Sequence, residues 1–521
     1  MRLLFIEPGT SRLQVEYLSA FLKREGHDVR GFLDPLFFDD MNIQSSRIAE
    51  VLSPRVELVD SIEKNPPRLL CFSVVSDHYR WATDLASFLK TRFDIPIVFG
   101  GIHPTSVPRR VLENNSVDYV IVGEGEGALS DLVSCLERGE DISNIPNLGF
   151  RRDGEIRVNP PRPLIEDLDT LPTPDKELLY SDRRSHSKGI YTTRATRGCP
   201  FRCSYCCHSF LAKLYEGKGK YYRRQSVDHF MKELVAAKKR YNPRVFIFHD
   251  DTLTTDRRWF REFTSRYARE VARPYFCWCS PPNVDEEIVD LLVSSGCINV
   301  EIGINGALGT YADGIAARGR FERSISRALE LLRKTSIFVV GDYIIGLPGQ
   351  NADEIQEVTK FLVRHPADHI NITWNRYYPR TAAVTEAVKM GLLSQEDVER
   401  IEKCESLPNY TQAPPGTEPT TLRHVNLLGM TPLLPRSIVL RWLEKKSRLR
   451  WIPKCYLEMP LVVANMIRAR LRGGKRRVFF VRTPREWLFT YLRELVRYVF
   501  RVAGKCKKRP GFDTKEQPAH N

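Results

Sequence analysis

A chain of 521 residues exceeds what one hydrophobic core usually supports, so its length alone predicts roughly three domains. Its composition, 42% hydrophobic and 27% charged, excludes a low-complexity chain, and no apolar run reaches the roughly 20 residues of a membrane span. The net charge of +15 is local, because residues 431–521 hold 23 Lys and Arg against 6 Asp and Glu. The N-terminus resembles a buried strand and not a signal peptide, so we expect a cytoplasmic protein with reduced cysteines.

Residues 1–145 alternate short apolar runs with helical patterns. The runs are rich in branched and aromatic residues, as buried parallel strands are, and they lie at 3–6, 69–75, 97–99 and 119–122. One helical face between them carries Trp81, Leu85, Phe88 and Leu89. This alternation predicts a doubly wound, Rossmann-like α/β domain whose ligand site lies beyond the carboxyl ends of its strands.

Six prolines crowd residues 146–188, which we interpret as an extended linker on the surface. A second alternating region follows, with strands predicted at 191–196, 245–249, 275–279, 298–302, 338–345 and 369–373, and helices at 227–241, 286–294 and 321–334. Six βα units in series predict a partial (β/α)6 barrel over 189–400, with its site at the carboxyl ends of the strands. Residues 401–521 are expected to form a basic, largely helical region.

A dense group of cysteines follows the first barrel strand. Cys199, Cys203 and Cys206 have the spacing C-x3-C-x2-C, with Gly198 and Pro200 able to turn the loop tightly. Three thiolates on such a loop would leave one iron of a four-iron cluster without a protein ligand, which favours a catalytic cluster. A zinc site, with Cys207 or His208 as the fourth ligand, is the alternative.

The pattern C-x3-C-x-Tyr-C after a first barrel strand resembles the radical S-adenosylmethionine superfamily. The resemblance implies that Cys199, Cys203 and Cys206 hold a [4Fe–4S] cluster whose open iron binds S-adenosylmethionine. Reductive cleavage then yields a 5′-deoxyadenosyl radical, and a donor such as flavodoxin or ferredoxin would supply the electron. Tyr205 would lie near the adenine, and Cys207 is outside the pattern.

Two further segments of the barrel resemble cofactor-binding segments of that family, and a third departs from the family's pattern. Asp250 and Asp251 would hold the methionine amino group, although one of the pair could instead cap a helix. Gly346 would let the backbone pass close to the adenosine, and a plain strand-to-helix turn explains it equally. Relatives commonly carry Gly-x-Glu after the fourth strand, whereas this chain has Asn305, which could bind a ribose without supplying a charge. Glu301, on the face of its strand that Gly303 shares, is the other candidate.

Two strands of the first domain end in glycine-rich segments, Phe-Gly-Gly-Ile-His-Pro-Thr at 99–105 and Val-Gly-Glu-Gly-Glu-Gly at 122–127. Alone they fit a nucleotide site or simple turns. Before a proline-rich linker and a cysteine-bearing barrel, they resemble the cobalamin-binding subgroup of radical S-adenosylmethionine enzymes, over about residues 1–375. The resemblance implies a cobalamin crevice lined by Ser73, Gly100, Gly101, Thr105, Gly123 and Gly125.

The histidine motif of methionine-synthase-type cobalamin domains, Asp-x-His-x-x-Gly, does not occur in this chain. A histidine ligand to cobalt is therefore not predicted. His103 stands beside Pro104 in a turn, and a structural role is favoured for it.

The basic C-terminal region ends in a predicted amphipathic helix. One stripe consists of Leu488, Leu492, Leu495, Val499 and Val502, and another of Arg493, Arg497 and Arg501. Such a helix can lie on an anionic membrane surface, but a helical cap on the barrel with a solvated basic face is the favoured interpretation. Nucleic acid is an unfavoured partner, because no RNA-binding module is recognised. Cys277 and Cys279 share one side of a strand and are interpreted as packing thiols.

The leading hypothesis is a cobalamin-dependent radical methyltransferase that alkylates an unactivated carbon of a small-molecule or lipid-like substrate. A cyclase or oxidative rearrangement enzyme of pigment, lipid or natural-product biosynthesis is the alternative. A methylthiotransferase is disfavoured, since its N-terminal domain would need its own cluster cysteines and this one has only Cys71 and Cys135. A non-catalytic binding role is the last option.

Overall fold

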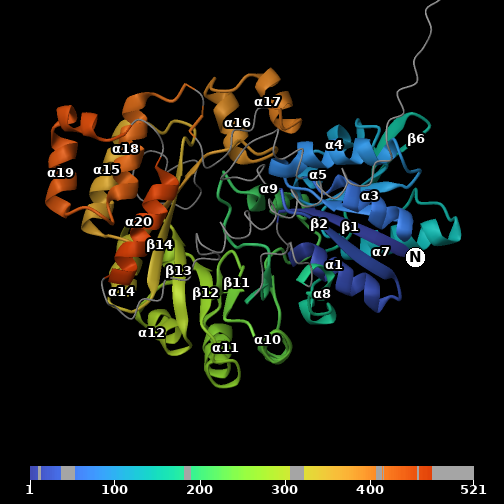
Figure 1. The fold of residues 1–521 in the computed structure, drawn as a ribbon, viewed down its shortest axis with the longest axis horizontal. Helices are drawn as coiled ribbons and strands as arrows, with labels where there is room; N and C mark the ends of the chain where they lie inside the picture. Colours follow the sequence, from blue (N-terminus) through green and yellow to red (C-terminus); the bar gives the residue numbers. More distant parts are fainter. Residues whose placement is uncertain are drawn as a thin grey trace, which may run out of the picture.

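The computed structural model describes residues 1–9, 13–36, 53–180, 189–305, 322–405, 413–414, 416–453 and 457–471. Two α/β units lie side by side, and the helices within residues 419–471 cover the far end of the second (Figure 1). Both predicted units are therefore present, and they place their sheets next to each other.

The first sheet has the strand order β2-β1-β3-β4-β5-β6-β7, and its first five strands are parallel. Its strands are β1 (Arg2–Pro8), β2 (Asp28–Asp34), β3 (Leu69–Ser73), β4 (Ile97–Gly100), β5 (Tyr119–Ile121), β6 (Leu148–Arg152) and β7 (Glu155–Val158). Its helices are α1 (Leu13–Arg24), α3 (Arg55–Lys64), α4 (Tyr79–Lys90), α5 (Ile102–Ser106), α6 (Pro108–Leu112) and α7 (Glu126–Arg138). Leu4 and Ile6 pack into one core while Leu3 and Phe5 pack into another, so both faces are covered and the doubly wound prediction is confirmed.

The proline-rich stretch departs from the predicted linker at its start. Residues from 148 to 158 form the antiparallel pair β6 and β7, which extends the first sheet. Leu148 and Phe150 are buried against that sheet, and the connecting Asp153 and Gly154 both have positive φ angles. Asp-Gly is the turn of a two-residue hairpin, so this dipeptide was the sequence signal for the pair. The strand β2 was also not predicted.

The second sheet has the order β15-β14-β13-β12-β11-β8, with all neighbours parallel. The strands are β8 (Ile190–Thr193), β11 (Val245–Phe248), β12 (Tyr275–Cys279), β13 (Cys297–Gly303), β14 (Phe338–Ile345) and β15 (His369–Trp374). The helices are α10 (Val227–Tyr241), α11 (Arg257–Glu270), α12 (Glu286–Ser294), α14 (Glu322–Arg333) and α15 (Ala352–Arg364). The predicted six-unit partial barrel is confirmed, and Cys277 and Cys279 lie in its core with their sulfurs 4.0 Å apart.

The described part of the C-terminal region is helical. It contains α16 (Ala382–Lys389), α17 (Gln395–Glu402), α18 (Pro419–Met430), α19 (Arg436–Glu444), the 3-10 helix η5 (Lys446–Trp451) and α20 (Glu458–Leu471). The amphipathic pattern predicted over 488–502 lies outside the described residues. Among the described helices, none has both the length and the apolar character needed to cross a bilayer.

A buried polar cluster joins the first domain to the barrel. Lys176 forms an ion pair with Glu16 on α1, and its ammonium donates to the carbonyl oxygen of Thr192 on β8 at 2.6 Å. Beside it, the Tyr191 hydroxyl donates to the Glu233 carboxyl group at 3.2 Å. Burial raises the pKa of Glu233 to about 7. The contact between the two domains therefore contains a carboxyl group that is largely protonated below neutral pH.

Glu233→Gln should flatten part of the pH dependence of folding stability. The folded state holds a proton on Glu233 that the unfolded chain loses above about pH 4.5, so wild-type stability should fall as pH rises towards 7, by up to about 3 kcal/mol. Urea unfolding at pH 5 and pH 8 measures this, with the exposed Glu262→Gln as control. Parallel profiles for wild type and Glu233→Gln would contradict the assignment.

Candidate active site

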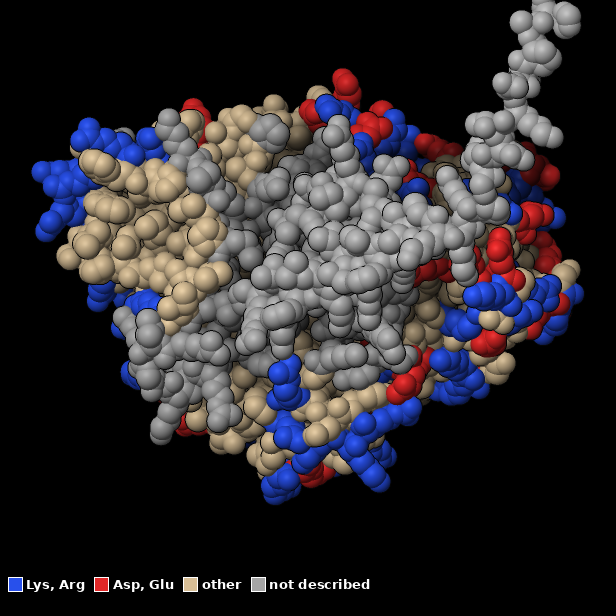
Figure 2. All heavy atoms as spheres, in the orientation of Figure 1, with Lys and Arg blue, Asp and Glu red and all other residues tan. Residues whose placement is uncertain are grey.

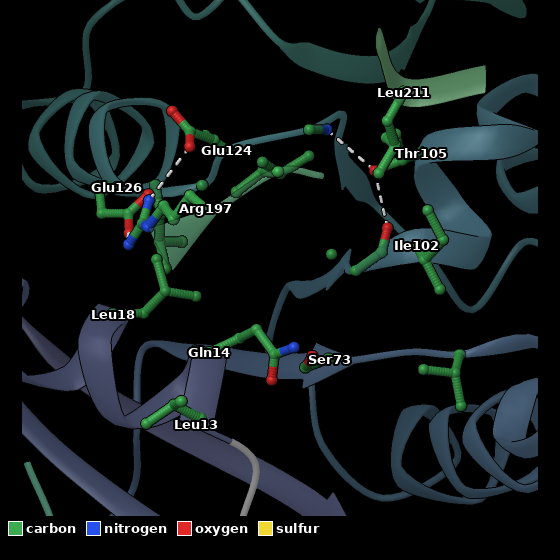
Figure 3. A pocket seen from close by; sticks show the side chains of 18 of the residues that line it. Leu13, Gln14, Leu18, Ser73, Ile102, Thr105, Glu124, Glu126, Arg197 and Leu211 are labelled. Carbon is green, nitrogen blue, oxygen red and sulfur yellow. Dashed lines mark hydrogen bonds and ion pairs between the residues drawn. The ribbon is translucent and has the colours of Figure 1, made fainter. Parts of the chain in front are cut away.

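A cavity of about 540 Å³ lies where the carboxyl ends of the first sheet meet the barrel. Its first wall includes all six residues predicted for the cobalamin crevice, Ser73, Gly100, Gly101, Thr105, Gly123 and Gly125. Its second wall comes from the barrel and the segments beside the cysteine loop, including Thr192, Arg194, Arg197, His208, Tyr215, Tyr221 and His249. Figure 3 shows Ser73, Thr105, Glu124 and Arg197 around this space.

Two of the four glycines in the first wall, Gly101 and Gly123, have neighbours so close that no side chain would fit. Gly101 has a φ of +100°, and a Cβ there would lie 2.7 Å from the carbonyl oxygen of Val74. Gly123 has a φ of +81°, and a Cβ there would overlap the hydroxyl of Tyr215. The Gly123 amide donates to Thr105 Oγ1 at 2.9 Å, which in turn donates to the carbonyl of Gly101 at 2.7 Å (Figure 3). At these two glycines the wall is rigid and exposes its backbone, against which a large flat ligand such as cobalamin can lie.

The cysteine loop is folded tightly. Cys199 and Cys203 are buried and Cys206 is half-buried, and the Cys206 amide donates to the carbonyl of Cys203 at 3.0 Å. Gly198 has a φ of +79°, and any Cβ there would collide with the backbone of Tyr221. Burial raises the pKa of the Cys199 thiol to about 12, so a bound cation would be needed to stabilise its thiolate. Three thiols on one tight loop, two of them buried, fit the iron–sulfur cluster that the spacing predicts.

His208 is a poor metal ligand in this arrangement. The ligand atoms of Cys206, Cys207 and His208 lie within 4.8 Å of one another, as the zinc alternative would require. However, His208 Nδ1 lies 2.6 Å from the Tyr221 hydroxyl, and its Nε2 lies 3.1 Å from Asp251 Oδ2. Both ring nitrogens therefore have protein partners, which argues against His208 as a zinc ligand and leaves Cys207 as the alternative fourth ligand.

The two predicted aspartates have different surroundings. Asp250 is fully buried, and its carboxylate accepts hydrogen bonds from the Ala195 amide at 3.0 Å and the Thr196 hydroxyl at 2.5 Å. It therefore holds the backbone just before the cysteine loop. Asp251 is more open, with 45% of its side chain exposed, and it pairs with His208. Of the two, Asp251 remains the candidate for binding a cofactor amino group.

The predicted adenosine contacts meet at the ends of β13 and β14. Tyr205, in the cysteine loop, and Ile344 both pack against Leu347, so Tyr205 lies beside the turn that contains Gly346. Gly346 has a φ of +83°, which few other residues would tolerate. Asn305 is buried, and its side-chain oxygen accepts from the Ile344 amide at 2.6 Å. That oxygen therefore joins the two strands. Burial and the neighbouring Asp342 raise the pKa of Glu301 to about 7.

Sequence reasoning missed an ion network between the cavity walls. Arg197, which precedes Gly198, pairs with Glu126 and with Glu124 at 3.3 Å, and Arg223 pairs with Glu124 at 2.8 Å. All four side chains are at most 17% exposed. Burial opposes ionisation of Glu124, but Arg197 and Arg223 hold its pKa below the usual value. The signal was the repeated acid in Gly123-Glu124-Gly125-Glu126, a segment from which we predicted roles only for the glycines.

His103 has the structural role that its turn context favoured. It is completely buried and does not line the cavity. Its Nδ1 lies 3.0 Å from the Ser76 hydroxyl and 3.6 Å from the sulfur of Cys404, which follows α17. Burial lowers its pKa to about 4, so the ring is neutral. His103 therefore helps to dock the C-terminal helices on the first domain.

Two family models match the chain. The B12 binding domain matches residues 8–133, and the radical SAM superfamily matches residues 193–362. Both matched segments contribute walls of the cavity.

Curated relatives and solved structures agree with this pairing. An uncharacterized methyltransferase of Pyrococcus horikoshii is 27% identical over 73% of this chain and 79% of its own length. An anaerobic magnesium-protoporphyrin IX monomethyl ester cyclase of Rubrivivax gelatinosus is 26% identical over 73% of this chain and 68% of its own. The structure of a radical S-adenosylmethionine methyltransferase from Kitasatospora setae, with cobalamin and a [4Fe–4S] cluster bound, has the same fold. It superposes with a TM-score of 0.60 at 19% identity, covering 75% of this chain and 78% of the other.

Gly123→Ala should weaken cobalamin binding at least about 10-fold, because the new methyl group collides with Tyr215 and displaces the loop. Gly139→Ala is the matched control, since Gly139 also has a positive φ but open space around its Cβ position. Adding Tyr215→Leu to Gly123→Ala should restore part of the loss. Absorbance of hydroxocobalamin retained after gel filtration measures binding, and equal retention by both glycine variants would contradict the packing argument.

Cys206→Ala should lose its cluster, whereas the adjacent Cys207→Ala should keep it. Only Cys206 belongs to the C-x3-C-x2-C spacing, although both thiols are half-buried at the start of α9 (Cys207–Leu214). Iron and sulfide analysis after anaerobic reconstitution measures the difference. Equal iron loss in the two variants would favour a site that uses both sulfurs.

Proposed function

We propose that this chain, which belongs to the cobalamin-binding radical S-adenosylmethionine enzymes, methylates an unactivated carbon of a small-molecule or lipid-like substrate. Its two domains bind cobalamin and, through a [4Fe–4S] cluster, S-adenosylmethionine. When bound, these groups supply hydrogen abstraction from carbon and a transferable methyl group. The relatives include a methyltransferase, which agrees with the use of both groups in one reaction.

One observation carries the proposal: residues from both cofactor domains line a single cavity. Gly100 and Gly123 contribute from the first domain, while Arg197 and His208, on either side of the cysteine loop, contribute from the second. A methyl group can reach an activated carbon only if both lie in one enclosed space, because such a carbon is quickly quenched elsewhere. A shared cavity supports transfer between the two cofactor sites.

The side chains of the cavity favour a largely apolar substrate. Apolar lining residues come from α1, β4, β5, α7 and α9, and they include Leu13, Leu18, Val98, Ile121, Leu129 and Leu211. They would exclude water from the reacting carbon. Arg194 and His249 provide polar groups on the barrel side, where they can orient one end of a substrate. A one-electron donor such as flavodoxin or ferredoxin would complete the system.

A second candidate reaction is ring closure or oxidative rearrangement. The similarity to a magnesium-protoporphyrin cyclase favours it, because that relative covers the same share of this chain as the methyltransferase. The two reactions differ in stoichiometry. Methyl transfer releases S-adenosylhomocysteine as well as 5′-deoxyadenosine, whereas hydrogen abstraction without methyl transfer releases only the second product.

The reconstituted holoenzyme should form S-adenosylhomocysteine and 5′-deoxyadenosine together when supplied with a reductant, trideuteromethyl-labelled S-adenosylmethionine and a lipid and metabolite extract. The labelled methyl group should appear in a product by mass spectrometry. Cys206→Ala should reduce both products at least about 100-fold, since the cluster would be lost. Sustained 5′-deoxyadenosine without S-adenosylhomocysteine would reject methyl transfer and favour the cyclase reaction.

A further inference from the structure

Residues 432–453, which contain α19 and η5, form a basic surface that we call the C-terminal corner. This segment holds six Lys and Arg but only one acidic residue, Glu444. Figure 2 shows Lys and Arg at this end of the molecule, next to a broad uncharged face over α18, α19 and α20. Elsewhere on the same view, blue and red side chains are mixed.

Large apolar side chains of α19, η5 and α20 are in contact with solvent. Trp451 is 70% exposed and Leu440 is 38% exposed, and Ile467 on the neighbouring α20 is 53% exposed. These are three of only eight large hydrophobic side chains that are exposed among the described residues. Single exposed apolar residues are ordinary, but a group of them within one small helical unit marks an interaction surface.

The C-terminal corner is held firmly against the barrel by its other side. Val439 and Leu443 of α19, with Leu449 and Ile452, pack against Val363 of α15 in a separate small core. Leu440 lies at the edge of the helix face that carries Val439 and Leu443, where it is 38% exposed. The exposed face is a fixed feature of a folded helix pair.

The cations of the C-terminal corner are not neutralised by the described part of the chain. Arg441, Lys445 and Arg450 are exposed, and none forms an ion pair with a described residue. In contrast, Arg257 and Arg261 on α11 both pair with Glu287. The Arg450 guanidinium instead lies over the Trp451 ring, 5.4 Å from its centroid. Positive charge and exposed apolar area are thus combined in one surface.

We propose that the C-terminal corner docks the protein on an anionic lipid bilayer. Anionic headgroups would pair with Arg441, Lys445 and Arg450, and the interfacial region is where a tryptophan ring such as Trp451 is most stable. Leu440 and Ile467 would enter the boundary of the acyl chains. A nucleic acid would satisfy the cations but would leave these aliphatic side chains in water. Docking does not depend on the methyl transfer reaction, so an experiment can reject either proposal without rejecting the other.

The test compares two triple variants of the full-length holoenzyme that change net charge equally. One is Arg441→Glu, Lys445→Glu and Arg450→Glu in the C-terminal corner. The control is Lys232→Glu, Lys239→Glu and Arg258→Glu, at exposed positions of α10 and α11. Flotation with phosphatidylcholine vesicles, with or without phosphatidylglycerol, measures binding. Circular dichroism and cofactor content check that both variants fold.

Wild type and the control variant should bind the vesicles that contain phosphatidylglycerol, and high salt should release them. The corner variant should bind at least about 100-fold more weakly, because each cation near an anionic surface contributes about 5-fold. Trp451→Ala alone should also weaken binding. The proposal is overturned if the wild-type protein does not bind anionic vesicles, or if both triple variants lose vesicle binding equally. It is also overturned if the corner variant loses affinity only for an RNA oligonucleotide.

Discussion

The buried contact between two acidic side chains and two arginines fixes the relation between the cofactor domains. Glu124 and Glu126 belong to the glycine-rich end of β5, while Arg197 immediately precedes the cysteine loop and Arg223 follows α9. Charges this deeply buried are stable only as a set, because removing one partner would leave an uncompensated ion in a medium that solvates it poorly. The network therefore resists any separation of the glycine wall from the loop that carries the thiols.

Other contacts, on different sides of the cavity, also hold the two domains together. Tyr215, at the end of the helix that follows the cysteine loop, accepts a hydrogen bond from the Glu124 amide at 2.8 Å. At another side, Arg376 and Tyr378, which follow β15, both contact Asp77 after β3. Each contact joins the carboxyl end of a strand in one sheet to a segment of the other. The cavity is consequently a property of the docked pair of domains.

This arrangement explains why the residues that shape the site are glycines or buried side chains. In the first wall, Gly101 and Gly123 have positive φ angles and neighbours too close for a side chain, so a flat ligand can lie against the backbone there. The cysteines are buried, and Asp250 holds the strand that leads into them through its hydrogen bonds to Ala195 and Thr196. The chemistry of the bound groups depends on this rigid support, since loosely held groups would not reach a common substrate.

The sequence by itself determined both domains, the six barrel strands, the three-cysteine loop and the glycines of the first wall. These features follow from local patterns, because apolar runs, ligand spacing and turn residues can be recognised in the sequence. The antiparallel hairpin at Asp153-Gly154 could also be recognised in the sequence, but the prolines around it led us to predict a linker there. Only the tertiary structure decided that Glu124 forms an ion pair with Arg197, and that both ring nitrogens of His208 contact protein groups. It also decided that Asp250 and the Asn305 side-chain oxygen accept hydrogen bonds from backbone amides. Such partners are far apart in sequence, and a polar side chain's role depends on which neighbours folding brings to it.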